Sequence, residues 1–290
     1  MYAVMGVTGQ VGAAVAESLL VRGKKIRVVV RDPKKAASWG ARGAEIAVAD
    51  YNDAAALTEA FRGTEGVFGM IPPYFAPAPG FPEARAVIAA IKAAIVAARP
   101  GRAVYLSTIG AQRGERTGLL KSLHILEEEL SRIGVPSAFL RAGWFMENSL
   151  WDVPSARDEG TIYSFLQPLD KAFSMVATAD IGRVGAETLL ETWTENRYIE
   201  VAGPKKYSPL EVAAAFSRVL GREVKAVVVP QETWADVFVK QGMPADRTAN
   251  RIEMLAEFNS GWIAFGVPGT EQATGKVELE TVLRELVERV

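Results

Sequence analysis

Three glycines near the start of the chain have the spacing of a phosphate-binding turn. Gly6, Gly9 and Gly12 follow the apolar run Tyr2–Met5 and open a helical pattern. In a strand–turn–helix of this kind, the first glycine permits the tight turn, the second lets the backbone approach a pyrophosphate, and the third lets helix and strand pack closely. The helix N-terminus then offers free N–H groups to the phosphates. The pattern predicts a dinucleotide-binding turn; the alternative is a glycine-rich turn without a ligand.

The end of the second predicted strand indicates which dinucleotide is bound. Enzymes that use NAD carry Asp or Glu there to accept from the ribose 2′-hydroxyl. This chain has Arg31, followed by Lys34 and Lys35, and a guanidinium can pair with a 2′-phosphate. We therefore predict NADP(H) in preference to NAD(H). Asp32 is a counter-signal that is also placed to cap a turn before Pro33, and Arg31 could instead be a solvated surface charge.

Two carboxylates follow the third predicted strand. Asp50 comes directly after the run that ends at Ala49, where a carboxylate could accept a hydrogen bond from the adenine amino group. Asp53 is explained more simply as the N-cap of the next helix, because an aspartate side chain can accept from the first free N–H groups of a helix.

The elements that must position these residues alternate between strand and helix. The predicted strands are Tyr2–Met5, Ile26–Val30, Glu45–Val48, Gly66–Ile71, Ala103–Ser107 and Ser137–Leu140. Apolar residues spaced by three and four predict helices around Val11–Leu19, Ile88–Ile95 and Leu119–Ile133. Apolar strands that alternate with helices indicate a parallel sheet buried on both faces. We therefore predict an α/β fold of the Rossmann type with a doubly wound parallel sheet.

The second half of the chain predicts a smaller α/β lobe. Residues 144–173 show no regular pattern and are expected to be irregular. Beyond them we predict a helix over Asp180–Glu191, a strand over Arg197–Val201, a capped helix from Ser208, a strand over Val224–Val229 and a helix over Gln231–Gln241. We expect a dinucleotide-binding domain over residues 1–150 and a substrate-binding lobe over residues 151–290, partly interwoven with the first.

The composition excludes several kinds of site. The chain has no cysteine and one histidine, which excludes disulfides, thiolate metal ligands, cysteine nucleophiles and a histidine-rich metal site. The formal net charge is −1, so bulk electrostatics indicate neither a nucleic-acid nor a membrane partner. We see no signal peptide and no apolar run as long as a membrane span. We expect a cytoplasmic protein that acts on a small molecule without a metal.

Several segments together resemble the atypical short-chain dehydrogenases of the NmrA-like group. They are the glycine turn, Arg31–Pro33, Val48–Tyr51, Leu140–Asn148 and Ala177–Gly182. The group includes NADPH-dependent reductases of quinones and dyes, and redox-sensing members that bind NADP without known turnover. The resemblance extends over nearly the whole chain and implies a Rossmann-type fold, a bound NADP(H) and, as in many members, a homodimer.

The resemblance also implies which residues line the site. Parallel sheets place their ligands at the carboxyl ends of the strands. With Asp50, the expected cofactor-binding residues are Gly6, Thr8, Gly9, Gln10, Val11, Arg31, Met70, Ile71, Pro72, Ser107, Gly143, Trp144 and Phe145. The aromatic residues expected around the substrate are Tyr74, Phe75, Phe81, Trp144 and Trp151. These side chains could stack a flat substrate, or they could simply belong to the core.

The usual proton donor of short-chain dehydrogenases is missing. Those enzymes use Tyr-x-x-x-Lys on the helix after the fifth strand, where the lysine lowers the pKa of the tyrosine and the tyrosine passes the proton. Aligned on the family pattern, this chain has Leu120 in place of the tyrosine and His124 in place of the lysine. His124 is therefore the candidate catalytic residue, near the nicotinamide ribose. Alternatively it is a partly buried helix residue that bonds to the backbone.

The missing acid changes which substrate we expect. A quinone that accepts hydride becomes a stabilised hydroquinone anion that water can protonate, whereas a reduced ketone becomes a basic alkoxide that needs a positioned acid. We therefore expect an NADPH-dependent reductase of quinones or similar flat acceptors. One alternative is an NADP(H)-sensing regulatory protein with little or no turnover. The other, ranked last, is an epimerase or dehydratase of nucleotide sugars, which usually needs the missing tyrosine.

Overall fold

The computed structural model describes all 290 residues, and its centre is an eight-stranded sheet. The strands are β1 (Tyr2–Met5), β2 (Ile26–Val30), β3 (Glu45–Val48), β4 (Gly66–Gly69), β5 (Ala103–Thr108), β6 (Ser137–Ala142), β10 (Arg197–Ala202) and β13 (Glu271–Thr274). Their order is β13-β10-β6-β5-β4-β1-β2-β3, and every neighbouring pair is parallel. The chain runs outward from β1 in both directions, which confirms the predicted doubly wound Rossmann-type fold.

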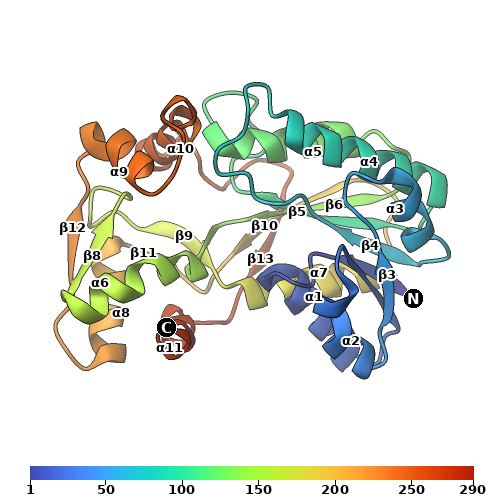
Figure 1. The fold of residues 1–290 in the computed structure, drawn as a ribbon, viewed down its shortest axis with the longest axis horizontal. Helices are drawn as coiled ribbons and strands as arrows, with labels where there is room; N and C mark the ends of the chain where they lie inside the picture. Colours follow the sequence, from blue (N-terminus) through green and yellow to red (C-terminus); the bar gives the residue numbers. More distant parts are fainter.

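Helices cover both faces of this sheet (Figure 1). On one face lie α3 (Ala54–Phe61), α4 (Pro82–Ala98) and α5 (Lys121–Leu130), and on the other lie α1 (Gln10–Val21), α2 (Ala37–Ala41) and α7 (Thr178–Leu190). Successive side chains of β1 enter opposite layers, since Val4 packs in the cluster with α1 and α7 while Ala3 packs in the cluster with α3, α4 and α5. This period of two explains why the strand is continuously apolar.

Helix α7 ties the second half of the chain to the glycine turn. It packs along α1, and a Cβ at Gly182 would lie 2.3 Å from the Cβ of Ala14. Only glycine therefore allows this close approach of the two helices. Residues 151–290 thus supply α7, β10 and β13 to the main three-layer body.

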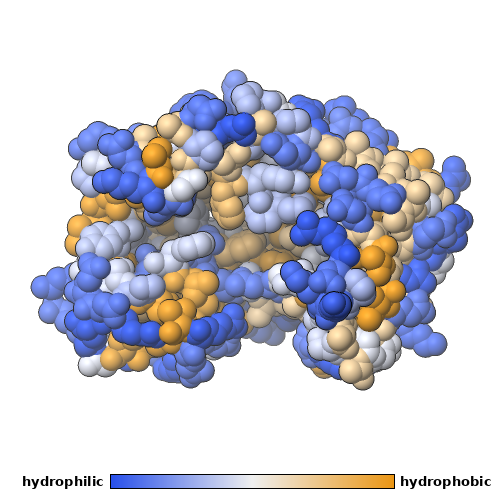
Figure 2. All heavy atoms as spheres, in the orientation of Figure 1, coloured by the Kyte–Doolittle hydropathy of each residue, from blue (hydrophilic) through white to orange (hydrophobic).

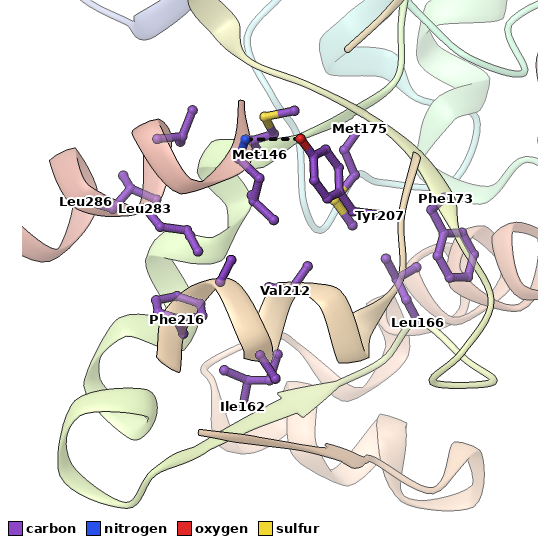
Figure 3. Packing of buried hydrophobic residues seen from close by; sticks show 14 of the residues in the cluster. Met146, Ile162, Leu166, Phe173, Met175, Tyr207, Val212, Phe216, Leu283 and Leu286 are labelled. Carbon is purple, nitrogen blue, oxygen red and sulfur yellow. Dashed lines mark hydrogen bonds between the residues drawn. The ribbon is translucent and has the colours of Figure 1, made fainter. Parts of the chain in front are cut away.

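The remaining elements form a second group beside the carboxyl ends of the strands (Figure 1). They are β7 (Trp144–Phe145), α6 (Val153–Asp158), β8 (Thr161–Ser164), β9 (Phe173–Val176), β11 (Lys206–Tyr207), α8 (Pro209–Leu220), β12 (Lys225–Val228), α9 (Trp234–Lys240), α10 (Ala249–Ser260) and α11 (Leu279–Arg289). Their core gathers Phe173, Tyr207 and Phe216 with apolar residues of α11 (Figure 3). The Tyr207 hydroxyl accepts from the backbone N–H of Leu279 at 3.3 Å, which holds the start of α11 on this core.

The predicted elements agree with the structure most closely where the local signal is strong. The strands β2 and β3 have the predicted bounds. Ser208 is the N-cap of α8 and forms the predicted capping box, in which Ser208 and Glu211 bond reciprocally. The prediction that residues 144–173 are irregular was wrong in part, because they contain β7, α6 and β8. These elements are short, and β8 pairs with the distant β12, so no local period reveals them.

Candidate active site

The glycine turn has the geometry expected of a phosphate-binding turn. Gly6 has φ +72°, and a Cβ there would lie 2.2 Å from the sulfur of Met70. A Cβ at Gly12 would lie 2.3 Å from the carbonyl of Gly6. Gly6 is therefore required by its left-handed backbone conformation, and Gly12 by the backbone that packs against it. Gly9 differs, because its φ of −109° suits any residue and a Cβ would meet no protein atom closer than 3.5 Å.

The space above Gly9 is therefore open to a ligand, and α1 points into it. Gly9 is the N-cap of α1, and no side chain caps the free N–H groups of the first turn. Thr8 and Gln10 are exposed beside it, while Val11 is buried and anchors the helix. Uncapped N–H groups at a helix N-terminus suit a diphosphate, so these residues fit the pyrophosphate of a dinucleotide.

Tyr51 joins the glycine turn, a position that was not predicted from the sequence. Its hydroxyl accepts from the backbone N–H of Gly6 at 2.7 Å, so its own O–H remains free to donate. Burial raises the pKa of the Tyr51 phenol, and the nearby charge of Arg31 opposes the rise. The only signal in the sequence is its place directly after Asp50, because the contact spans 45 positions of the chain.

Arg31 is exposed at the end of β2 and is engaged in no ion pair. Burial raises the pKa of Tyr74, and the charge of Arg31 opposes that rise. Asp32 accepts from the N–H of Lys34 at 3.0 Å, which confirms it as a cap. Asp50 accepts from the backbone N–H of Asn52 at 2.9 Å through Oδ1, and its Oδ2 accepts no bond from the chain. An unpaired guanidinium beside the turn suits a phosphate.

The segment after β4 borders the same turn. Met70 contacts the glycine turn through its sulfur, Ile71 is buried and Pro72 is half-buried. Ser107, at the end of β5, is buried and donates its hydroxyl to Oε1 of Glu127 at 2.6 Å. Any contact of Ser107 with a cofactor would therefore use its remaining lone pairs or its backbone.

His124 lies on α5 with its ring bonded to the backbone. Nδ1 is 2.8 Å from the carbonyl oxygen of Ala111, so in the neutral ring Nδ1 carries the proton and Nε2 is free to accept. Nε2 lies 3.4 Å from a carboxylate oxygen of Glu128. Leu120 packs against the core of the second group of elements. His124 thus makes the bond to the backbone that its alternative, structural interpretation predicts. Its Nε2 accepts no hydrogen bond from the chain.

Residues 143–145 connect β6 to the second group of elements. A Cβ at Gly143 would lie 2.7 Å from the carbonyl oxygen of Ser174, so glycine is needed for the close passage of β7 beside β9. Trp144 packs edge-on against Phe258 of α10, with ring centroids 5.3 Å apart. Phe145 packs instead against the cluster between the sheet and α1. Alternate side chains of β7 therefore bridge the two bodies of the protein.

The other expected aromatic residues are distributed over several surroundings. Tyr74 and Phe81 pack against the cluster of α3, α4 and α5. Phe75 is 61% exposed and Trp151 is 83% exposed. Figure 2 shows that the face in view is hollowed between the second group of elements and the helices around α1, with apolar residues at its base. The structure does not gather the aromatic residues into one packed wall.

The site residues include no cluster of metal ligands. No group of three or more histidine, aspartate or glutamate side chains is arranged to hold a metal ion. None of the helices is both long enough and apolar enough to cross a membrane.

Comparison with known proteins places this site in a family. A model of the NmrA-like family matches residues 2–281. The chain belongs to the NmrA-like family. Among curated relatives, the NAD(P)H azoreductase of Xenophilus azovorans is 27% identical over 277 residues, which are 95% of this chain and 93% of that protein. Quinone oxidoreductase 2 of Escherichia coli is 30% identical over 263 residues, covering 90% of this chain and 87% of the relative.

A solved structure of an NmrA-like relative shows the same fold. The NADPH-dependent quinone oxidoreductase of Escherichia coli, crystallised with NADPH, superposes with a TM-score of 0.76 at 25% identity. The match covers 100% of this chain and 99% of that one. The glycine turn and the elements that surround it therefore belong to a fold that binds NADPH in a relative.

Proposed function

We propose that this NmrA-like protein is an NADPH-dependent reductase that transfers hydride to a quinone or a similar flat conjugated acceptor. The observation that carries the proposal is the open space above Gly9, which α1 faces with uncapped N–H groups. The names of the azoreductase and quinone oxidoreductase relatives support the reaction class. The names of these two relatives refer to different conjugated acceptors. We therefore expect the site to recognise its acceptor by its flat shape more than by one particular functional group.

The residues that would hold the cofactor fit its separate parts. The turn at Gly9 suits the pyrophosphate, and Arg31 and the free O–H of Tyr51 suit the 2′-phosphate side of the adenosine. Gly143 and Trp144 lie at the carboxyl end of β6, where the nicotinamide is expected. When bound, NADPH supplies a hydride.

The protein's own contribution to the chemistry is binding and orientation. Neither Leu120 nor His124 provides the tyrosine hydroxyl of ordinary short-chain dehydrogenases, and Nδ1 of His124 is bonded to the carbonyl of Ala111. A quinone that gains a hydride needs one further proton, and its anion is stable enough to take that proton from water. We propose that the acceptor is protonated by solvent, with His124 holding the loop after β5 in place.

The test is steady-state oxidation of NADPH by the purified protein with a panel of quinones and azo compounds, alongside NADPH binding measured by fluorescence. We expect NADPH binding and turnover with at least one flat acceptor. Binding without any turnover would contradict the reductase and favour the second candidate, a sensor of NADP(H). The departure from Tyr-x-x-x-Lys at Leu120 and His124 is the observation that favours this second candidate. A sensor would bind a partner with an affinity that changes with the NADP⁺/NADPH ratio.

A further inference from the structure

The loop after β5, residues 109–120, contains a guanidinium that forms neither an ion pair nor a hydrogen bond within the chain. Arg113 is half-buried, and its Nε is fully buried without a hydrogen-bond partner. It takes part in no ion pair. A half-buried guanidinium whose Nε has no partner and whose charge has no carboxylate beside it is able to bind an anion from outside the protein.

Trp262, which follows α10, fixes the position of this guanidinium. Its indole ring stacks under Arg113, with the guanidinium carbon 3.6 Å from the ring centroid. Arg116 also contacts the same ring, at 4.7 Å, but it is neutralised by a bidentate pair with Glu257, at 2.8 and 3.0 Å. Of two guanidinium groups on one indole, one has its counter-charge and the other does not. Stacking leaves the edge of a guanidinium free to donate.

The other charged groups around the loop do not supply the missing anion. Lys121 donates to the carbonyl of Gly114 and has no carboxylate partner. Glu128 faces His124 at 3.4 Å and Arg132 at 3.8 Å. Glu115 is exposed and forms no ion pair. Glu253 accepts from the backbone N–H of Gly118 at 2.8 Å and forms no ion pair with Arg113. The Arg113 guanidinium therefore has no direct counter-charge.

Two more polar atoms of the same loop are buried without partners. The hydroxyl of Thr117, a residue that is only 1% exposed, has no hydrogen bond, and it is a potential donor. The side-chain oxygen of Gln112 is also buried and unpartnered, and it can only accept. Unsatisfied buried polar groups are uncommon and often mark a place where a ligand or water binds.

The loop is attached to the candidate active site at several points. It leaves the carboxyl end of β5, the edge of the sheet that also carries the glycine turn. Its Ala111 carbonyl contacts Nδ1 of His124 at 2.8 Å. A Cβ at Gly110 would lie 3.0 Å from Ile263, next to Trp262. The loop that carries Arg113 therefore lies at the edge of the sheet where the acceptor is expected.

From these contacts we infer that Arg113, held on Trp262, is an anion-binding subsite for the acceptor. It selects flat conjugated compounds that carry a sulfonate, carboxylate or phosphate substituent. This inference rests on the proposed reductase function, because it names the substrate class of the same site. A planar fork of donors matches the oxygen atoms of these anions.

The first experiment measures binding to the NADP⁺-loaded protein by calorimetry. The probes are naphthalene-2-sulfonate, its uncharged analogue naphthalene-2-methanol, and inorganic sulfate. We expect the sulfonate to bind about tenfold more tightly than the alcohol, and Arg113→Gln to remove that difference. Arg116→Gln is the matched control, since it removes a guanidinium from the same indole, and it should retain the difference. Equal losses in both variants would overturn the inference in favour of general surface charge. Sulfate that binds as tightly as the sulfonate would also overturn it, because the site would then belong to a free oxyanion.

The second experiment measures kcat/KM for 1,2-naphthoquinone and for its 4-sulfonate with NADPH. We expect the wild type to prefer the sulfonate and Arg113→Gln to lower that preference about tenfold, chiefly through KM. A preference that the substitution does not change would contradict the subsite. Turnover of neither quinone would contradict the proposed reductase, and the calorimetric comparison would then decide on the subsite by itself. Thermal unfolding of each variant checks that it is folded.

Discussion

Glu127 and Arg141 form a bidentate ion pair inside the protein, between α5 and β6. The Nε–Oε1 distance is 3.0 Å and the Nη2–Oε2 distance is 2.6 Å, and each side chain is only 6% exposed. The hydroxyl of Ser107 donates to the same carboxylate, and the guanidinium lies 4.6 Å from the ring centroid of Tyr198. The pair thus joins α5 to β6, and through Ser107 and Tyr198 it also contacts β5 and β10.

Replacing one member of this pair should destabilise the fold strongly. Glu127→Gln leaves the Arg141 guanidinium buried without its counter-charge, so we expect a loss of about 3–5 kcal/mol in the free energy of unfolding. Urea denaturation measures the loss. The exposed pair of Arg218 and Glu280 is the control, and Glu280→Gln should cost less than about 1 kcal/mol. Similar losses of unfolding free energy in the two variants would show that the buried pair stabilises the fold no more than an exposed pair does.

The glycine turn predicts opposite outcomes for two similar substitutions. Gly12→Ala places a Cβ 2.3 Å from the carbonyl of Gly6, and we expect it to destabilise the protein by about 1–3 kcal/mol or more. Gly9→Ala meets no protein atom within 3.4 Å, so its stability should change by less than about 1 kcal/mol. Because the new methyl group enters the space for the pyrophosphate, NADPH affinity should fall at least about tenfold. Thermal unfolding and NADPH fluorescence distinguish the two effects. A Gly9→Ala variant with normal affinity would contradict the placement of the pyrophosphate.

The sequence predicts those parts of the site whose signal is local. The glycine spacing, the cap at Asp32 and the capping box at Ser208 each depend on residues within a few positions of one another, and the structure has all three features. The sheet is also predictable, because its first strands are short and mainly apolar and alternate with helical patterns. Glycine spacing indicates the backbone geometry of the phosphate-binding turn, and apolar runs indicate which strands are buried in the core.

Contacts between distant segments were not predictable. Tyr51 reaches Gly6, Glu127 takes the hydroxyl of Ser107, and Trp262 stacks on Arg113, and each of these contacts depends on the packing of separate elements. No element was predicted after Gln241, although α10, β13 and α11 lie there. Strand β13 is exposed and polar, over Glu271–Thr274, so it lacks the apolar pattern on which strand prediction depends.

Arg31 should determine the choice between the two nicotinamide cofactors. Its guanidinium forms no ion pair within the protein, so Arg31→Ser should leave the fold unchanged. We expect NADPH affinity to fall by about 10- to 100-fold and NADH affinity to change less than about threefold, because only NADPH carries the 2′-phosphate. Fluorescence titration with both cofactors measures the change. Lys34→Ser, on the exposed turn beyond β2, is the control and should have a smaller effect. Equal affinities for NADPH before and after the Arg31 change would show that this residue is a solvated surface charge.

Asp152 should make stability depend on pH. Burial raises the pKa of its carboxyl from the ordinary 3.8 to about 7, and the side chain accepts no hydrogen bond from the chain. The folded state therefore holds this proton more tightly than the unfolded state. Between pH 4 and pH 7 the contribution of Asp152 to stability falls as the pH rises, and above pH 7 the loss is complete.

Asp152→Asn removes the cost of burying the charged carboxylate. Comparing the variant with the wild type separates the effect of Asp152 from that of other groups that titrate in the same pH range. Near pH 4 the variant and the wild type should have similar free energies of unfolding. At pH 8 the variant should be more stable by roughly 1–3 kcal/mol, less than the full shift would give because the residue is only partly buried. Urea denaturation at both pH values measures the difference. Asp158→Asn, at the exposed end of α6, should show no such dependence. A gain from Asp152→Asn that is equal at pH 4 and pH 8 would mean that the amide improves packing, and that the buried charge does not destabilise the fold.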